Sequence, residues 1–372
     1  MQMRSVYLLI LLDFSKAFDR VNHDILLEKM KRLGFGDSTC FFRSYLESRT
    51  QQVRVGNTLS TKLQVMRGVP QESVLGPLLY SVYTCDLPRV VKYSSVVMFA
   101  DDVQLLFRYR DAKEIQNLKL DLSAVENWVL ENELVLNPGK SKAIHFGKGE
   151  PINPSLLIGG NAIPFVESAR NLGVVIDKNL RFEKHISAVV RNARWKLTKL
   201  NKISRLVSTE KLKRIVEACV VYPMLYSSAV WGTRILAVEK RRLQLVQNWA
   251  VKLVEKKSKY DHCSYLFEKH KWARIMQLVA LKIACLTRSA LRGDFGEGMR
   301  RMFHMFDHQY STREKGSRFI LPKVKGAGQD SFSFMGARTC NKLPISQAKT
   351  GKSYRREMLA HIRKHSLFEV YL

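Results

Sequence analysis

The chain has 372 residues, enough for two or three domains of roughly 100–200 residues each. Hydrophobic residues make up 46% and charged residues 26%, a globular composition that excludes disorder over most of the length. Lys and Arg number 62 against 33 Asp and Glu, and this formal net charge of +29 favours a nucleic-acid partner over a membrane-surface or ribosomal-type protein.

No apolar stretch approaches the roughly 20 residues of a membrane span, and the apolar run near the start is too short for a signal peptide. The six cysteines are scattered without metal-ligand spacing, which fits a reducing compartment. We therefore expect an intracellular protein without a membrane partner, in the nucleus, the cytoplasm or both.

The first predicted element is a buried central strand over residues 7–12, a continuous apolar run. A central strand needs neighbours on both sides, so we expect the chain to begin within a domain. A helix follows, because Asn22 and Asp24 offer N-cap chemistry, residues 25–33 have helical spacing, and Gly34 suits the position after a helix.

Residues 41–46 indicate a second helix. Strands are predicted over residues 51–56 and 63–67, joined through a turn at Gly56 and Asn57. After the break at Pro70, residues 74–84 predict a buried helix.

A second buried strand is predicted over residues 96–100, and residues 102–106 continue it as a hairpin. Residues 112–132 have the apolar spacing of an amphipathic helix, and residues 141–146 predict a strand. This alternation to about residue 150 indicates an α/β or an α+β domain.

Short strands are expected up to residue 176, and the pattern is helical from residue 186 onward. Residues 191–214 hold nine Lys or Arg and a single acid, Glu210, an imbalance that favours a phosphate-facing helix over a solvated surface. The candidate nucleic-acid contacts are Arg191, Arg194, Lys196, Lys199 and Lys202. Residues 290–352 are basic and weakly periodic, which predicts a loosely packed tail.

Carboxylates end the two apolar strands, Asp13 after the first and Asp101 and Asp102 after the second. Such placements are costly unless a cation compensates them, so they favour a divalent-metal site over an ordinary surface turn. Two Mg²⁺ or Mn²⁺ ions in such a site would activate an attacking oxygen and stabilise a leaving one, as nucleotidyl transfer requires.

Five segments resemble, in the same order and spacing, the palm motifs of reverse transcriptases from jockey-like non-LTR retrotransposons. They are residues 12–23, 67–79, 99–102, 136–141 and 171–177. Lys16, Asp19 and His23 point to this element class in particular. Residues 331–334 and 341–344 are similar to the C-terminal region of such elements, so the resemblance spans nearly the whole chain.

The resemblance implies an α+β fold, a polymerase palm with an antiparallel sheet backed by helices. We expect the palm over residues 1–185, truncated at its N-terminus and without fingers. A helical thumb is expected over residues 186–258, and a basic, mostly helical C-terminal region over residues 259–372.

The resemblance also implies roles at the metal site. Asp13 and Asp101 would hold both ions, Asp102 would assist at the primer end, and the backbone of Phe14 would lie against the triphosphate. Lys140 matches a lysine that protonates the leaving pyrophosphate, although a lysine in such a loop is more often only solvated.

The implied substrates are an RNA template, a DNA primer and deoxynucleoside triphosphates. Phe18 matches a steric gate against a 2′-hydroxyl, with a plain core aromatic as the alternative. Gln71 and Ser73 would contact the incoming nucleotide or the template. Asp19 is expected to pair with a basic group or to cap the following helix.

Glu72 departs from the family pattern, which has glycine there. A like charge about 4 Å from a phosphate costs about 4 kcal/mol at an effective dielectric constant of about 20. With the fingers absent as well, two hypotheses stand: an RNA-directed DNA polymerase, or a catalytically inactive, nucleic-acid-binding remnant of one. Cys340 stands where such elements have tryptophan, which concerns only local packing.

Overall fold

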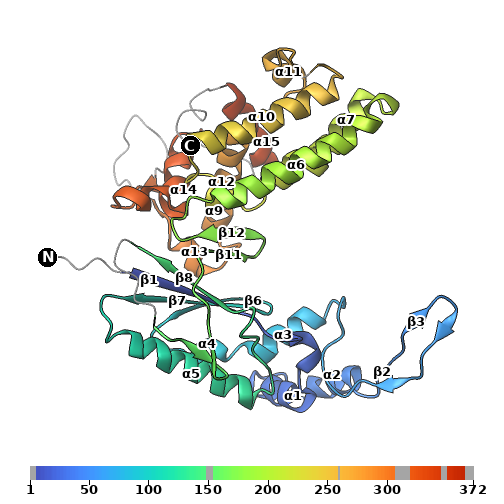
Figure 1. Cartoon of the computed structure of the whole chain (residues 1–372), viewed down its shortest axis with the longest axis vertical. Coiled ribbons are helices and arrows are strands. Elements are labelled where there is room, and N and C mark those ends of the chain that lie inside the picture. Colours follow the sequence, from blue (N-terminus) through green and yellow to red (C-terminus); the bar gives the residue numbers. More distant parts are fainter. Residues whose placement is uncertain (1–5, 148–153, 259, 306–318, 345–349, 365–372) are drawn as a thin grey trace. The chain divides into compact units, whose positions relative to one another are not determined.

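A computed structural model describes residues 6–147, 154–258, 260–305, 319–344 and 350–364 (Figure 1). The chain folds as two compact units, residues 1–179 and 180–372. The first unit joins a small antiparallel sheet to helices and the second is mainly helical, so the predicted α+β class is confirmed. No helix in the described parts is long and apolar enough to cross a membrane.

The sheet of the first unit has four antiparallel strands in the order β6-β7-β1-β8. They are β1 (Val6–Leu12), β6 (Ser95–Phe99), β7 (Asp102–Tyr109) and β8 (Lys142–Phe146). β1 lies between two neighbours, as its apolar run predicted. Its register pairs Leu12 with Val103, and both side chains point into the core.

Helices cover one face of this sheet, and Figure 1 shows α5 running along it. The helical elements are η1 (Ala17–Arg20), α1 (His23–Arg32), α2 (Ser38–Leu46), α3 (Gly76–Thr84), α4 (Leu87–Val90) and α5 (Ile115–Glu131). Leu26, Leu79 and Leu118 join Ile10 of β1 in one hydrophobic cluster. Asn22 caps α1 by accepting from the backbone N–H of Asp24, as predicted.

The strand predicted to be buried at residues 96–100 is instead the edge strand β6. Val97 is 55% exposed and Phe99 is 64% exposed, because β7 is the only strand paired with β6 among the described residues. A short apolar run cannot distinguish an edge strand from a central one.

Two predicted strands, residues 51–56 and 63–67, are shorter than expected. The chain forms β2 (Thr50–Gln51) paired with β5 (Leu63–Gln64), and β3 (Arg54–Val55) paired with β4 (Thr58–Leu59). The turn at Gly56 is confirmed, with a φ of 59°. All strand residues here are exposed, so no core extends the pairing.

Helix α3 begins two residues later than predicted, because the Ser73 hydroxyl accepts from the N–H of Gly76 at 2.9 Å. Val74 is 94% exposed and Leu78 is 57% exposed, so the helix is amphipathic rather than buried.

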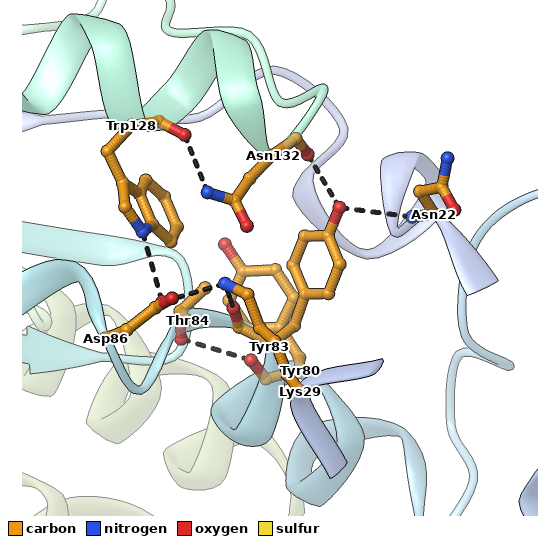
Figure 2. A network of polar contacts seen from close by, with 8 residues as sticks. All are labelled: Asn22, Lys29, Tyr80, Tyr83, Thr84, Asp86, Trp128 and Asn132. Atoms are coloured by element: carbon orange, nitrogen blue, oxygen red, sulfur yellow. Dashed lines mark hydrogen bonds and ion pairs between the residues drawn. The ribbon is translucent and has the colours of Figure 1, made fainter. Parts of the chain in front are cut away.

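A polar network joins α1, α3 and α5 behind the sheet (Figure 2). The ammonium of Lys29 donates to the carbonyl of Tyr83 at 2.6 Å and to Asp86 at 2.8 Å. The Tyr83 hydroxyl donates to the carbonyl of Asn132 at 2.6 Å and accepts from the backbone N–H of Asn22 at 3.3 Å. Burial lowers the pKa of Lys29. The network anchors Asn22, the residue that follows the segment carrying Asp13 and Phe18.

Short hairpins end the first unit: β9 (Leu157–Ile158) with β10 (Asn161–Ala162), and β11 (Ser168–Asn171) with β12 (Val174–Asp177). The second unit begins with α6 (Glu183–Ile203), η2 (Ser204–Leu206), α7 (Thr209–Val216), η3 (Glu217–Val221), α8 (Tyr222–Met224), α9 (Ser228–Trp231) and α10 (Ala237–Val254). The predicted boundary at residue 185 falls inside α6, and the thumb assignment of residues 186–258 stays a prediction.

The remaining elements are α11 (Ser264–Lys269), α12 (Ile275–Leu291), α13 (Glu297–Arg300), β13 (His304–Met305), β14 (Phe319–Ile320), η4 (Gly326–Asp330), α14 (Phe332–Asn341) and α15 (Gly351–Lys364). The prediction of a loosely packed tail is wrong for much of the described part. A Cβ on Gly336 of α14 would lie 2.5 Å from Oγ1 of Thr287 on α12, so the two helices pack closely. Small residues make this contact, and because they are not large apolar side chains, the sequence shows no helical spacing of hydrophobic residues there. Residues 306–318 and 345–349 lie outside the described residues.

Candidate active site

Three carboxylates gather where β1 ends beside the β6–β7 turn. Leu12 pairs with Val103, so the register carried one residue further sets Asp13 opposite Asp102. Phe99 pairs with Asp102, which leaves Ala100 and Asp101 as the two residues of the turn. Residues 88 positions apart in the sequence (101 − 13) therefore meet at one end of the sheet, as predicted.

The charges at this end of the sheet are only partly compensated by the protein. Burial raises the pKa of Asp102, and the negative charges of Asp101 and Asp13 raise it further. Oδ2 of Asp13 is buried and accepts no hydrogen bond within the described structure. Its nearest cationic atom is Nζ of Lys140, at 3.8 Å. This arrangement suits a bound cation. No set of three or more Asp, Glu, His or Cys in the described residues is arranged to hold a metal alone.

An open pocket of about 430 Å³ lies over these carboxylates. Its lining residues are Asp13, Phe14, Lys16, Ala17, Phe18, Pro70, Gln71, Glu72, Pro77, Asp101 and Lys140. Six residues predicted for catalysis or nucleotide binding are therefore brought together. Asp102 lies instead on a second pocket of about 90 Å³, shared with Asp13, Lys140 and Arg170.

The pocket wall is held by contacts between two segments of the chain. Val69 donates its N–H to the carbonyl of Phe18 at 2.9 Å, and Gly68 donates to Val21 at 2.8 Å. A ring nitrogen of His23 lies 2.8 Å from the carbonyl oxygen of Gly68. Gly68 has a φ of 92°, and a Cβ there would lie 2.9 Å from the Cα of Asp19, so only glycine fits without strain.

Asp19 has neither of its predicted roles. Its Oδ1 accepts a hydrogen bond of 2.7 Å from the side-chain amide of Gln71, so it orients a residue of the pocket. Phe18 stacks on Tyr80 with ring centres 4.6 Å apart while also lining the pocket, so it is both a partial core residue and a candidate gate. The hydroxyl of Ser73 is used at the start of α3 and does not line the pocket, so its nucleotide contact stays a prediction.

The segment of residues 136–141 packs beside Asp13. Asn137 donates its N–H to the carbonyl of Asp13 at 2.8 Å, and Asp13 donates its own N–H to the hydroxyl of Ser141 at 3.3 Å. Phe14 forms an antiparallel bridge with Leu136, which fixes the Phe14 backbone at the pocket. The side chain of Lys140 is 71% exposed and its Nζ lies 3.8 Å from Oδ2 of Asp13, so its catalytic role stays a prediction.

Three non-glycine residues around the pocket have left-handed backbone conformations: Lys16 (φ 51°), Glu72 (φ 56°) and Ala100 (φ 52°). Such a conformation costs an L-residue about 1–2 kcal/mol. Glu72 is exposed and lines the pocket, so the substitution for the family glycine adds both strain and negative charge.

Several lining residues were given no role from the sequence, and Lys16 and Arg170 are two of the cations among them. Lys16 lines the main pocket, and Arg170 lies beside Asp13 on the smaller one. The sequence could have indicated Lys16, because it lies three residues after Asp13 in the motif of residues 12–23. Arg170 directly precedes another such motif.

The five cations predicted to face nucleic acid do not share one face of α6. Arg194 lines a groove with α10, whereas Lys196 lines a small cavity on the other flank, near Cys219. Arg191, Lys199 and Lys202 are exposed.

Comparison with known proteins supports the resemblance. Residues 1–176 match the family model described as reverse transcriptase (RNA-dependent DNA polymerase). The chain is 33% identical over 258 residues to a probable RNA-directed DNA polymerase from transposon BS of Drosophila melanogaster, covering 66% of this chain and 28% of that protein. It is 30% identical to the RNA-directed DNA polymerase from mobile element jockey of Drosophila funebris, covering 59% of this chain and 25% of that protein.

Among solved structures, the chain aligns with telomerase from Candida tropicalis in complex with a fragment of telomeric RNA. That match has a TM-score of 0.38 and 11% identity, and it covers 80% of this chain and 48% of the other. The apo enzyme matches with a TM-score of 0.35 and 13% identity, over 74% and 50% of the two chains. Residues 1–176 are thus similar to a reverse transcriptase domain, and the chain resembles the RNA-directed DNA polymerases of the BS and jockey elements.

Proposed function

We propose that this chain carries the catalytic centre of an RNA-directed DNA polymerase that works by two-metal nucleotidyl transfer. The observation that carries the proposal is the meeting of Asp13, Asp101 and Asp102 at one end of the sheet. There Oδ2 of Asp13 lacks a hydrogen-bond partner among the described residues, and burial together with like charges raises the pKa of Asp102. The chain spans 28% of the length of its relative from transposon BS, so activity, substrates and partners are all part of the proposal.

In this proposal Asp13 and Asp101 hold two Mg²⁺ or Mn²⁺ ions, with Asp102 beside them and the backbone of Phe14 against the triphosphate. When bound, the metals activate the primer 3′-hydroxyl and neutralise the triphosphate. Because no group of three or more Asp, Glu, His or Cys among the described residues could hold a metal ion, the proposal requires the triphosphate oxygens to supply further ligands.

The other pocket residues position the substrates, a deoxynucleoside triphosphate on an RNA template and a DNA primer. Asp19 holds the amide of Gln71 toward the nucleotide or template. Phe18, braced by Tyr80, blocks a 2′-hydroxyl. The ammonium group of Lys140, which lies near Asp13, acts as a general acid and donates a proton to the leaving pyrophosphate. These substrates imply a site of action in the nucleus or cytoplasm.

A second candidate is a nucleic-acid-binding protein without polymerase activity. Glu72 favours it, because its carboxylate lines the pocket that would receive a triphosphate. The net charge of +29 serves either function.

Primer extension separates the two candidates. The full chain is incubated with a DNA primer on an RNA template, deoxynucleotides and Mg²⁺ or Mn²⁺, and binding of the same duplex is measured in parallel. We expect extension that is lost in Asp101→Ala while binding persists. If the unmodified chain binds the duplex but does not extend the primer, the second candidate is established. If it neither binds nor extends, both candidate functions are contradicted.

A further inference from the structure

The second unit contains a large basic groove between α6 and α10. Its volume is about 990 Å³, and its thirteen lining residues include five cations and no carboxylate. The cations are Arg194, Arg205, Lys252, Lys256 and Lys257. The indole of Trp249 also lines the groove and is half-buried.

Helix stabilisation explains only part of this charge. Lys252, Lys256 and Lys257 lie near the C-terminus of α10, where cations favour the helix dipole. Arg194 and Arg205, however, come from α6 and η2, the opposite wall of the same groove. The dipole of α6 accounts equally for Arg205, which follows the C-terminus of that helix, but not for Arg194, which lies within it.

The one acid in the run of residues 252–257 does not line the groove. Glu255 contacts Nζ of Lys269 at 2.6 Å and a ring nitrogen of His270 at 2.7 Å, both on the side of α11. Among described residues, Arg194, Arg205, Lys256 and Lys257 make no ion pair. The positive charge of the groove is therefore left for a ligand.

Trp249 gives the groove a second kind of surface. Within the described structure its indole makes no hydrogen bond and no ring contact, and Leu245, 49% exposed, lies one turn away on the same helix. An aromatic face flanked by cations matches a nucleobase flanked by phosphates. A duplex hides its base faces in the stack, so only an unpaired base can reach such a ring.

We propose that the groove between α6 and α10 binds an unpaired segment of nucleic acid, with one base stacked on Trp249. The flanking phosphates contact Arg194 and Arg205 on one wall and Lys256 and Lys257 on the other. The proposal does not rest on the polymerase function, since it concerns the other unit of the chain and holds equally for an inactive protein.

The experiment measures binding of the full chain to a fluorescein-labelled 12-nucleotide single strand, with EDTA and without deoxynucleotides. The same sequence as a blunt duplex and the free mononucleotide are compared with it. Trp249→Ala is the main variant and Trp249→Phe keeps an aromatic face. Trp195→Ala is the matched control, because Trp195 is also on the second unit, is 61% exposed and lines no part of the groove.

We expect Trp249→Ala to weaken single-strand binding about 5- to 100-fold, as loss of one stacked base does, with duplex binding changed less than about twofold. Trp249→Phe should retain most of the affinity, and Trp195→Ala all of it. Arg205→Ala should lower the salt dependence of single-strand binding by about one counterion. Equal weakening of single strand and duplex, or no effect of Trp249→Ala, overturns the proposal. Saturation by the mononucleotide alone would also overturn it.

The outcome does not depend on catalysis. Asp101→Ala is included so that loss of polymerase activity and loss of groove binding are read separately. Far-ultraviolet circular dichroism of each variant establishes that the helical unit is folded. If Trp249→Ala unfolds, the salt dependence of single-strand binding by Arg205→Ala decides the question, because an unchanged salt dependence would overturn the proposal.

Discussion

The side-chain amide of Gln71 donates a 2.7 Å hydrogen bond to Oδ1 of Asp19, joining two motifs that lie 52 residues apart. Gln71 lines the pocket and Asp19 does not, so the bond holds the amide of Gln71 in place from outside the pocket. Asp19 is thus a positioning residue in the proposed polymerase.

Removing this acceptor should loosen Gln71. A hydrogen bond to a charged group contributes about 1.5–3 kcal/mol, so Asp19→Ala should raise the KM for deoxynucleotides about tenfold or more with a smaller change in kcat. Asp19→Asn keeps an oxygen acceptor and should restore most of the loss. Steady-state primer extension provides the measurement, and equal defects in both variants would contradict a positioning role.

Replacing Glu72 with glycine should increase both the stability of the first unit and the affinity for deoxynucleotides. Glycine adopts its φ of 56° without strain, so Glu72→Gly should stabilise the first unit by about 1 kcal/mol and lower the KM for deoxynucleotides. Glu72→Gln removes only the charge, so it should lower the KM without changing stability. Denaturant unfolding and primer extension together test this separation. Equal unfolding midpoints for all three proteins would show that the backbone carries no strain there.

Cys340 should be the least reactive of the thiols for which burial is described. Burial raises its pKa to about 12, so almost no thiolate exists at pH 8. Cys40, Cys85 and Cys219 are exposed. Mass spectrometry after brief treatment with iodoacetamide should find those three labelled and Cys340 unmodified until denaturant is added. Early labelling of Cys340 would mean that α14 does not pack on α12 as described.

The sequence predicted which candidate residues meet in space better than it predicted the exposure of the elements that carry them. Asp13, Asp101 and Lys140 were assigned from motifs. Asp13 and Asp101 meet through the register of β1 and β7, and Lys140 is brought to them by the bridge between Phe14 and Leu136. Motifs predict such residues because each motif position requires one type of side chain. The edge position of β6 was not readable, since an apolar run has the same pattern whether or not a second strand covers it.

Roles that depend on long-range partners were also missed. The acceptor role of Asp19 requires knowing that Gln71 lies beside it, which no spacing of 52 residues reveals. The packing of α14 rests on Gly336 and its neighbours, and small residues in a helix contact produce no apolar period. The groove beside Trp249 combines α6 with α10, so it exists only in the packed helices.

Tyr83 should make stability depend on pH. Burial raises its pKa to about 12, whereas an unfolded tyrosine titrates near 10. Between pH 10 and 12 the unfolded state therefore releases a proton that the folded state keeps, and stability falls as the pH rises. Tyr83→Phe removes this dependence together with two hydrogen bonds, which cost about 1–2 kcal/mol at pH 8.

The difference in unfolding free energy between the unmodified chain and Tyr83→Phe should therefore be largest at pH 8 and shrink at pH 11. Tyr354 also has a raised pKa, but it is present in both proteins and cancels in the difference. Tyr80 is present in both as well, and only the smallest contribution to its raised pKa, the charge of Tyr83, differs between them. Tyr93→Phe is the matched control, because that ring is 50% exposed and its substitution should leave the pH dependence unchanged. A difference that stays constant from pH 8 to 11 would mean that the Tyr83 hydroxyl is not held in the network joining α1, α3 and α5.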